Sequence, residues 1–408
     1  MASGDPPWMK SLDGVDWASV DHAYGPASDV PEMIRTLAGG KEADAFEALE
    51  TLSNTLNHQG SIYPATAPAL PFLIEALRAP GPGTRVRLGL LSLVGGIAEG
   101  GVQWIDEKES GGLSVPELVA AVWRGSDVYA SLLAQDPDPD VRMHAAHVLG
   151  LLASLGPTRQ PPGITIDHGR VLSGLFSRLA EERDPLTLSS SVFALGSAIP
   201  HDPRIRPVLR HVLGRTGKEE APRVAAALAL VEADGERHEE ETAAALLIEA
   251  MSRGAATDLL FQPRTGGSKE DIRYLPWFVG KLRFRLCRAL CDWSAADDGR
   301  MSRVLPALLV GVRAAGEYTA ESDIGPVLHW LWPGRTIRFE KKSDGKMERV
   351  LPPPVTSGEL KGLKRTVVEA CYENASIWNP RNGNVSLTFM RVGLPDSRAE
   401  LGRLLGKG

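Results

Sequence analysis

The stretch DPDPDVRMHAAHVLGLL, residues 136–152, determines how the rest of the chain is interpreted. Its apolar side chains recur at Val141, Ala145, Val148 and Leu152, a spacing that places them on one face of a helix. The acidic, proline-containing lead supplies a turn, candidate N-cap residues and negative charge near the positive end of the helix dipole. The stretch therefore predicts an amphipathic helix that follows an acidic turn.

Similar units recur along the chain. Residues 84–95 align Arg87 with Arg142, which lies 55 residues later, and residues 184–196 align Gly196 with Gly150 at a spacing of 46. Shorter copies begin near residues 42 and 221. Other apolar helical patterns lie between the copies, at residues 69–77 and 170–179. A Gly-rich, acidic insertion at residues 100–112 explains the longer spacing of 55 residues. Because no helix pair of this size buries its apolar face alone, neighbouring pairs are expected to stack into one continuous core.

These units resemble HEAT-like repeats, which are paired antiparallel helices with a period of about 40–47 residues. The Asp-x-x-Val-Arg marker of that family is matched best by Asp138, Val141 and Arg142. The resemblance implies an all-α chain folded as an α-solenoid. A short hairpin is expected in its carboxyl-terminal part, around Ser343-Asp344-Gly345.

The sequence predicts four segments. Residues 1–41 form an N-terminal cap and residues 42–256 a block of HEAT-like repeats. Residues 257–330 form further helical pairs, and residues 331–408 form a C-terminal cap with the hairpin and helices. In the later part of the chain, the apolar patterns predict helices over 277–293, 301–315, 357–373 and 396–405.

Composition and charge narrow the functional classes. The 408 residues are 43% hydrophobic and 24% charged, as in a globular protein, and carry a net charge of −6. Residues 331–408 carry +6 and the rest −12, and such an acidic body lacks the basic footprint of a nucleic-acid-binding protein. No secretory signal or membrane-spanning stretch is visible and the chain has three cysteines, so a cytoplasmic protein without membrane attachment is expected.

Two polar-aromatic motifs stand out near the N-terminus, WASVDHAYG at 17–25 and NHQGSIYPAT at 57–66. They resemble a signature of a group of bacterial proteins in the PBS-lyase HEAT-like repeat superfamily, in which His-Ala-Tyr-Gly precedes His-Gln-Gly and Tyr-x-Ala-Thr. Trp378-Asn-Pro and Gly393-Leu-Pro fit the same pattern at the other end of the chain. The resemblance implies an architecture and carries no activity with it.

The side chains of these motifs combine flat faces with hydrogen-bonding tips, which suit a site for a peptide or a small polar ligand. The candidate binding residues are Trp17, His22, Tyr24, His58, Gln59 and Tyr63. The alternative is structural: the motifs join the first helices, Gly25 and Gly60 end helices, and the polar tips satisfy buried backbone groups.

A second candidate is the basic stripe Lys281, Arg285 and Arg288, spaced along one helix near Asp292-Trp293. HEAT-like DNA glycosylases use a basic groove of this kind, but the acidic body favours a structural role or contact with an acidic protein surface.

Two further groups of residues are weaker candidates for a functional site. His144 and His147 share a helical face without further ligands nearby, so they are interpreted as surface or concave-face residues and no metal or cofactor is predicted. Cys287 and Cys291 lie one turn apart and are interpreted as small core residues.

Three functions follow from these patterns. The leading one is a cytoplasmic HEAT-repeat scaffold that presents a concave surface to a protein or peptide partner. The second is an enzyme or lyase acting on a peptide or small molecule, with His22 or His58 as general acid/base. The third, a HEAT-like DNA glycosylase, is the least favoured.

Overall fold

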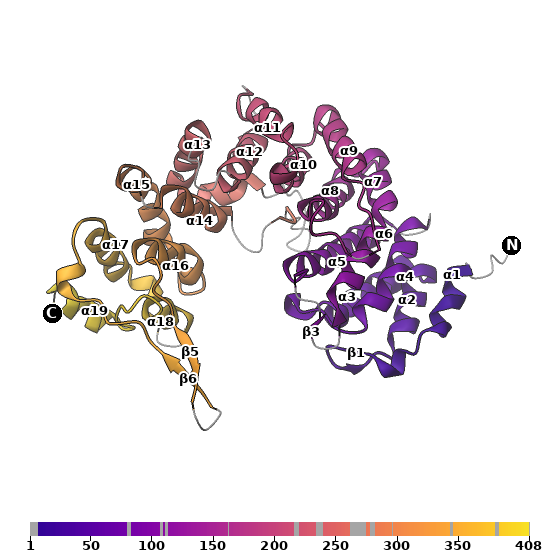
Figure 1. Ribbon diagram of the computed structural model, residues 1–408, viewed down its shortest axis with the longest axis horizontal. Helices are drawn as coiled ribbons and strands as arrows, with labels where there is room; N and C mark the ends of the chain where they lie inside the picture. The colour runs from indigo at the N-terminus through magenta and orange to yellow at the C-terminus, as the bar shows by residue number, and fades with distance from the viewer. Residues whose placement is uncertain are drawn as a thin grey trace. The chain divides into compact units, whose positions relative to one another are not determined.

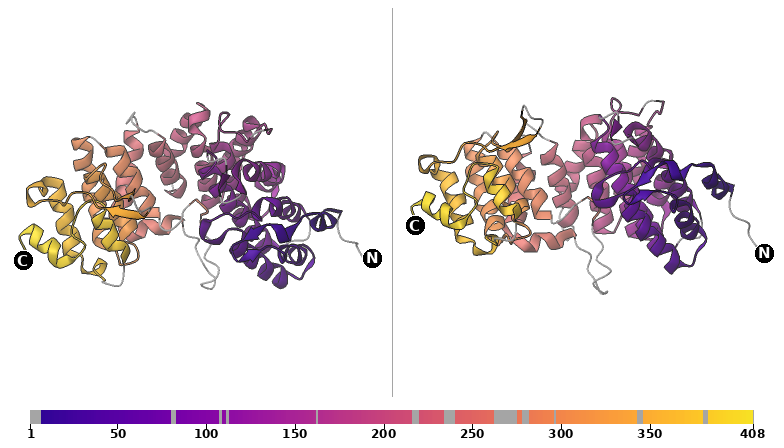
Figure 2. Two further views of the ribbon diagram at one scale, coloured as in Figure 1. Left: turned by 60° about the horizontal axis from the view of Figure 1, so that its bottom comes forward. Right: turned by 90° about the horizontal axis from the view of Figure 1, so that it is seen from below.

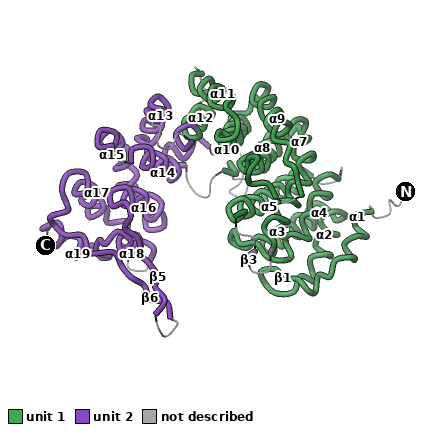
Figure 3. The backbone as a smooth tube through the Cα atoms, viewed as in Figure 1, with its two compact units in different colours: residues 1–229, 265–277 green, residues 230–264, 278–408 purple. Residues whose placement is uncertain are grey.

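A computed structural model shows a chain built almost entirely of helices (Figure 1). It describes residues 7–79, 83–106, 109–110, 113–161, 163–215, 220–233, 240–261, 275–277, 282–295, 297–342, 346–379 and 383–407. The chain divides into two compact units, which are residues 1–229 with 265–277 and residues 230–264 with 278–408 (Figure 3).

The helices of unit 1 pack neighbour to neighbour in two rows. Figure 2 shows the helical chain from two further sides. One row is α3 (Glu42–Leu56), α5 (Thr84–Gln103), α8 (Pro139–Ser154) and α10 (Pro185–Ser197). The other is α2 (Val30–Gly39), α4 (Thr66–Arg78), α6 (Val115–Arg124), α7 (Ser126–Gln135) and α9 (His168–Glu181), with α11 (Ile205–Leu213) against α10. This arrangement confirms the predicted α-solenoid class. Short α1 (Pro7–Lys10) precedes the rows, and α12 (Glu220–Glu232) carries residues of both units.

The acidic lead of α8 behaves as its sequence predicts. The Asp138 carboxylate accepts a hydrogen bond from the backbone N–H of Asp140 and so caps the helix. Arg142 donates to both carboxylate oxygens of Glu182 at 2.8 and 3.0 Å, and to the carbonyl oxygens of Asp136 and Pro137. Although burial opposes the shift, the Arg142 guanidinium holds the pKa of Glu182 below its usual range. The repeat marker Arg142 thus ties the start of α8 to the end of α9.

Trp277 lies against the α8–α10 pair although it is far away in sequence. Its indole Nε1 donates to Ser190 Oγ at 2.8 Å, and its ring meets His147 edge-on with centroids 4.7 Å apart. Sequence analysis places Trp277 at the start of a helix, and this prediction is wrong because the residue lies in a turn. The corresponding helix, α14, begins at Leu282, and residues 278–281 lie outside the described part of the chain.

Unit 2 also contains two rows of helices. One is α13 (Glu241–Ser252), α15 (Asp298–Ala314), α17 (Gly362–Glu373) and α19 (Arg398–Leu405), and the other is α14 (Leu282–Ser294), α16 (Ala320–Leu331) and α18 (Gly383–Met390). Helix α17 starts five residues later than predicted, because Leu360 and Lys361 leave the helical region and Gly362 has a φ of +53°.

The remaining elements are short. The 3-10 turns are η1 (Ser11–Gly14), η2 (Trp17–Ser19), η3 (His58–Gly60), η4 (Ile199–His201), η6 (Gly254–Phe261), η8 (Ser357–Glu359) and η9 (Ala375–Ile377). The predicted C-terminal hairpin is confirmed as β5 (Arg338–Lys341) paired antiparallel with β6 (Met347–Val350), and its turn, 343–345, lies outside the described residues. Two smaller pairs were not predicted: β1 (Asp21–His22) with β2 (Gly25–Pro26), and β3 (Glu109–Ser110) with β4 (Leu113–Ser114).

Of the helices that the structure describes, none has the length and apolar character needed to cross a bilayer.

Candidate functional site

The first polar-aromatic motif folds into a tight hairpin. Strand β1 pairs with β2 so that His22 opposes Gly25, and Ala23 and Tyr24 form the two-residue loop. Gly25 has a φ of +124° and Gly60 a φ of +81°, values that favour glycine. Gly25 therefore closes a hairpin instead of ending a helix, and Gly60 ends the 3-10 turn η3.

Backbone hydrogen bonds attach this hairpin to the first helices. The Ala23 N–H donates to the carbonyl oxygen of Thr55 near the end of α3, and the Ala65 N–H donates to that of Asp21, both at 3.0 Å. The buried Thr66 hydroxyl donates to the carbonyl oxygen of Leu56 at 2.7 Å and accepts from the Tyr63 N–H at 3.2 Å. The two motifs together therefore join the end of α3 to the start of α4.

His22 is buried and holds the loop in place. Its Nδ1 accepts the backbone N–H of Tyr24 at 3.0 Å, so the ring proton lies on Nε2, which donates to Asp29 Oδ1 at 3.0 Å. With both ring nitrogens engaged inside the fold, His22 has none left for proton exchange with a ligand.

Tyr24 projects from the loop and is 67% exposed. Its hydroxyl lies 3.2 Å from His58 Nδ1, and its ring meets that of His58 edge-on with centroids 5.5 Å apart. Gln59, next to His58, is exposed and has a φ of 53°. We refer to Tyr24, His58 and Gln59 as the Tyr24 patch, an exposed group in which the two motifs meet.

Two of the predicted binding residues belong mainly to the fold. Trp17 is 5% exposed, packs its ring on Phe72 with centroids 6.2 Å apart, and donates from Nε1 to the carbonyl oxygen of Leu12 at 2.8 Å. Tyr63 is half-buried, and its backbone N–H bonds to Thr66.

The basic stripe is divided by its surroundings. The Arg285 guanidinium donates to both carboxylate oxygens of Glu232 at 2.7 Å, whereas the Arg288 side chain is 80% exposed. Trp293 is buried in the core, and Lys281 lies outside the described residues. In the described part of the stripe, Arg285 is therefore held by Glu232, whereas Arg288 makes only a long, exposed ion pair with Asp292 at 3.8 Å.

The remaining candidates lie partly or wholly inside the fold. His147 is 5% exposed beneath Trp277, so its predicted placement on the surface or concave face is wrong. His144 is half-buried, and burial lowers its pKa. Cys287 and Cys291 lie in the core as predicted, and burial raises the pKa of the Cys291 thiol. Within the described ranges, no three His, Cys, Asp or Glu residues are grouped so that they could hold a metal ion.

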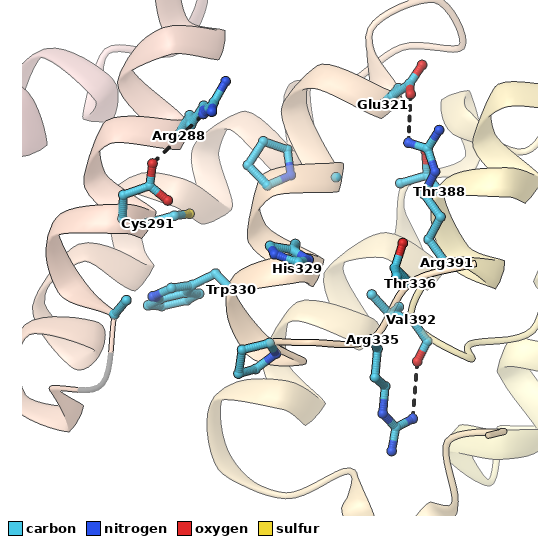
Figure 4. Close-up of a pocket in the computed structure, with 15 residues that line it drawn as sticks. Arg288, Cys291, Glu321, His329, Trp330, Arg335, Thr336, Thr388, Arg391 and Val392 are labelled. Atoms are coloured by element: carbon cyan, nitrogen blue, oxygen red, sulfur yellow. Dashed lines mark hydrogen bonds and ion pairs between the residues drawn. The ribbon is translucent and has the colours of Figure 1, made fainter. Parts of the chain in front are cut away.

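A pocket of about 760 Å³ lies in unit 2 along α14, α16 and α18 (Figure 4). Sequence patterns point to only three of its lining residues, Arg288, Cys291 and Asp292 of α14. Apart from Ala295, the others belong to α16, to the segment after it, and to α18 and the residues that follow it. The adjacent Gly325 and Pro326 within one apolar helix are the only sequence signal of a hollow there.

Comparison with known proteins adds little to this geometry. No protein-family model matches the chain, and a search of curated proteins found no match. One similar solved structure is the crystal structure of Kap121p bound to Nup53p, at 12% sequence identity and a TM-score of 0.32. The similarity covers 93% of this chain and 44% of that one, so this chain spans less than half of the other protein.

Proposed function

We propose that this helical-repeat protein binds a protein or peptide partner, and that the Tyr24 patch is one of its contact surfaces. The observation that carries the proposal is an aromatic side chain that is 67% exposed and yet held at two points. Its backbone N–H is fixed by His22, and its hydroxyl is fixed by His58. A tyrosine ordered before binding loses little side-chain entropy when a partner covers it, and tyrosine is enriched among residues that dominate binding energy.

The polar atoms of the patch suit a peptide backbone. The Tyr24 hydroxyl is a hydrogen-bonding group at the tip of a flat ring, as recurs in protein–protein contacts, and the exposed Gln59 next to His58 in sequence adds an amide. The rows of stacked helices supply the extended surface that repeat proteins use for longer partners. The excess negative charge of residues 1–330 favours a partner with basic residues. Membership in the PBS-lyase HEAT-like superfamily, suggested by the motifs, is part of this proposal.

The enzymatic alternative has less support. General acid/base catalysis needs an imidazole nitrogen within reach of a substrate, and both nitrogens of His22 are occupied by Tyr24 and Asp29. The Tyr24 hydroxyl lies 3.2 Å from His58 Nδ1, but among the described residues no third group is placed to orient this imidazole as a general base.

Photo-crosslinking from a neighbouring position tests the proposal and leaves the patch intact. We expect benzoylphenylalanine at Ser61, an exposed position beside the patch, to form an adduct with one polypeptide in a lysate of the native cells. Excess unlabelled wild-type protein should suppress this adduct at least tenfold more effectively than the Tyr24→Ala protein, because truncating such an anchor costs about 2 kcal/mol or more.

The matched control places the same crosslinker at Tyr318, which is 88% exposed in unit 2. The proposal fails if Ser61 yields no specific adduct, if both positions give the same one, or if Tyr24→Ala competes as well as the wild type.

A further inference from the structure

The pocket in unit 2 has features of a small-molecule site that are independent of the Tyr24 patch. Its volume of about 760 Å³ falls within the range of about 300–1,000 Å³ that is typical of ligand pockets. Figure 4 shows that it brings together Arg288 and Cys291 of α14, His329 and Trp330 of α16, and Arg391 after α18.

The hollow exists because α16 carries little side-chain bulk at one turn. Gly325 has no side chain, and the compact ring of Pro326 follows it. A Cβ atom added to Gly325 would meet only the Thr388 methyl group, at 3.7 Å. The space between α16 and α18 is therefore open at this level, and a larger residue at 325 has room to enter it without striking the backbone.

Two lining groups that a ligand can reach, the Arg288 guanidinium and the His329 ring, make no hydrogen bond among the described residues. The Arg288 guanidinium forms an exposed ion pair with Asp292 at 3.8 Å, which is too long for a hydrogen bond. The Trp330 indole Nε1 is buried and makes no hydrogen bond within the described structure. The exposed His329 ring lies near the same carboxylate, since burial raises the pKa of Asp292 and both Arg288 and His329 oppose that shift.

The other charged lining groups already have partners. Glu321 accepts a hydrogen bond from Arg391 at 2.9 Å. Arg335 donates to Glu359 at 2.7 Å and to the carbonyl oxygen of Val392 at 3.1 Å. Asp292 lines the pocket as well, so the lining carries three arginines, Arg288, Arg335 and Arg391, against the two carboxylates of Asp292 and Glu321. This excess of positive charge favours an anionic ligand, and Arg288, whose carboxylate contact is the longest of the three, is the cation most open to it.

The rest of the lining is apolar. The Trp330 ring, Pro326, Pro333 and Val392 contribute the surface on which a hydrophobic body would pack. We propose that this pocket binds a small organic anion, whose charged oxygens meet Arg288 and His329 and whose apolar body packs beside Trp330. A free carboxylate or phosphate and the carboxyl terminus of a peptide carry this same chemistry.

Titration calorimetry of the full-length protein tests the proposal with three anionic probes: 3-phenylpropionate, phenyl phosphate and acetyl-Ala-Ala-Phe with a free carboxylate. At least one is expected to bind, and its neutral counterpart (the amide, or phenol for the phosphate) should bind at least tenfold more weakly. Arg288→Gln should weaken binding by tenfold or more, the loss expected for a charge-assisted hydrogen bond. Gly325→Leu should abolish binding because its side chain fills the hollow.

Arg313→Gln is the matched control, since Arg313 is an exposed arginine on α15 in the same unit, and it should bind like the wild type. If the tripeptide binds more tightly than both small anions, the site is assigned to a peptide carboxyl terminus. If a small anion binds more tightly than the tripeptide, the site is assigned to a free small molecule. Either result supports an anion site. Absence of binding by all three probes would overturn the proposal. So would equal binding of the neutral counterparts, or unchanged affinity in Gly325→Leu.

Discussion

Replacing Asp323 by alanine is expected to lower the free energy of unfolding by about 3–5 kcal/mol. Asp323 is fully buried in α16, and its two carboxylate oxygens accept hydrogen bonds from Arg283 Nε and Nη2 at 2.8 and 2.9 Å. Arg283 is itself only 3% exposed, and its remaining ion pair, with Asp258, is longer at 3.4 Å. The substitution leaves a buried guanidinium without its main counter-charge, a loss that water cannot repair.

A urea titration followed by circular dichroism measures this effect, and Glu321→Ala is the control. Glu321 lies in the first turn of the same helix and also pairs with an arginine, Arg391, but both side chains are about half exposed. An exposed pair contributes about 0–1 kcal/mol, so the control should change the stability little. Equal losses in the two variants would contradict the role assigned to the Arg283–Asp323 pair.

Replacing Gly150 by alanine should also destabilise the fold, by about 1–3 kcal/mol. A Cβ atom at Gly150 in α8 would lie 2.6 Å from Ala194 Cα of α10 and 2.7 Å from the Trp277 ring. Since one of these contacts is backbone, relief requires the two helices to move apart. The added strain outweighs the roughly 1 kcal/mol by which alanine is otherwise preferred over glycine in a helix.

Gly174 provides a control of opposite sign. It lies in the middle of α9 with no atom within 4 Å of an added Cβ, so Gly174→Ala should stabilise the protein by about 1 kcal/mol. Thermal unfolding of the two variants side by side gives the comparison. A gain in stability for both would show that α8 and α10 do not approach as closely as described.

The helical-repeat fold was predictable from local sequence. The Asp138 cap, the apolar face of α8 and the recurrence of the unit depend on residues that are close along the chain. The C-terminal hairpin was predictable for the same reason, since its turn residues adjoin its strands. By contrast, the place of Trp277 against α8 depends on Ser190 and His147, which are far from it in sequence.

The candidate sites depend on tertiary contacts, and sequence patterns showed only parts of them. The two motifs make Tyr24 and His58 stand out in the sequence, but the contact between these side chains depends on the β1–β2 hairpin and its hydrogen bond to Thr55. Helical spacing grouped Arg285 with Arg288, but it could not show that the Arg285 guanidinium is hydrogen-bonded to Glu232, which is distant in sequence. The sequence did not predict the pocket in unit 2, because Arg288 and His329 come from two different helices, α14 and α16.

Native mass spectrometry of the protein purified from its own cells at moderate salt tests the central claim, partner binding through the Tyr24 patch, most directly. We predict that the wild-type chain and a Tyr318→Ala control carry a stoichiometric polypeptide, whereas Tyr24→Ala emerges bare although its circular dichroism is unchanged. A wild-type chain without a bound polypeptide, or equal retention by Tyr24→Ala, would contradict the account.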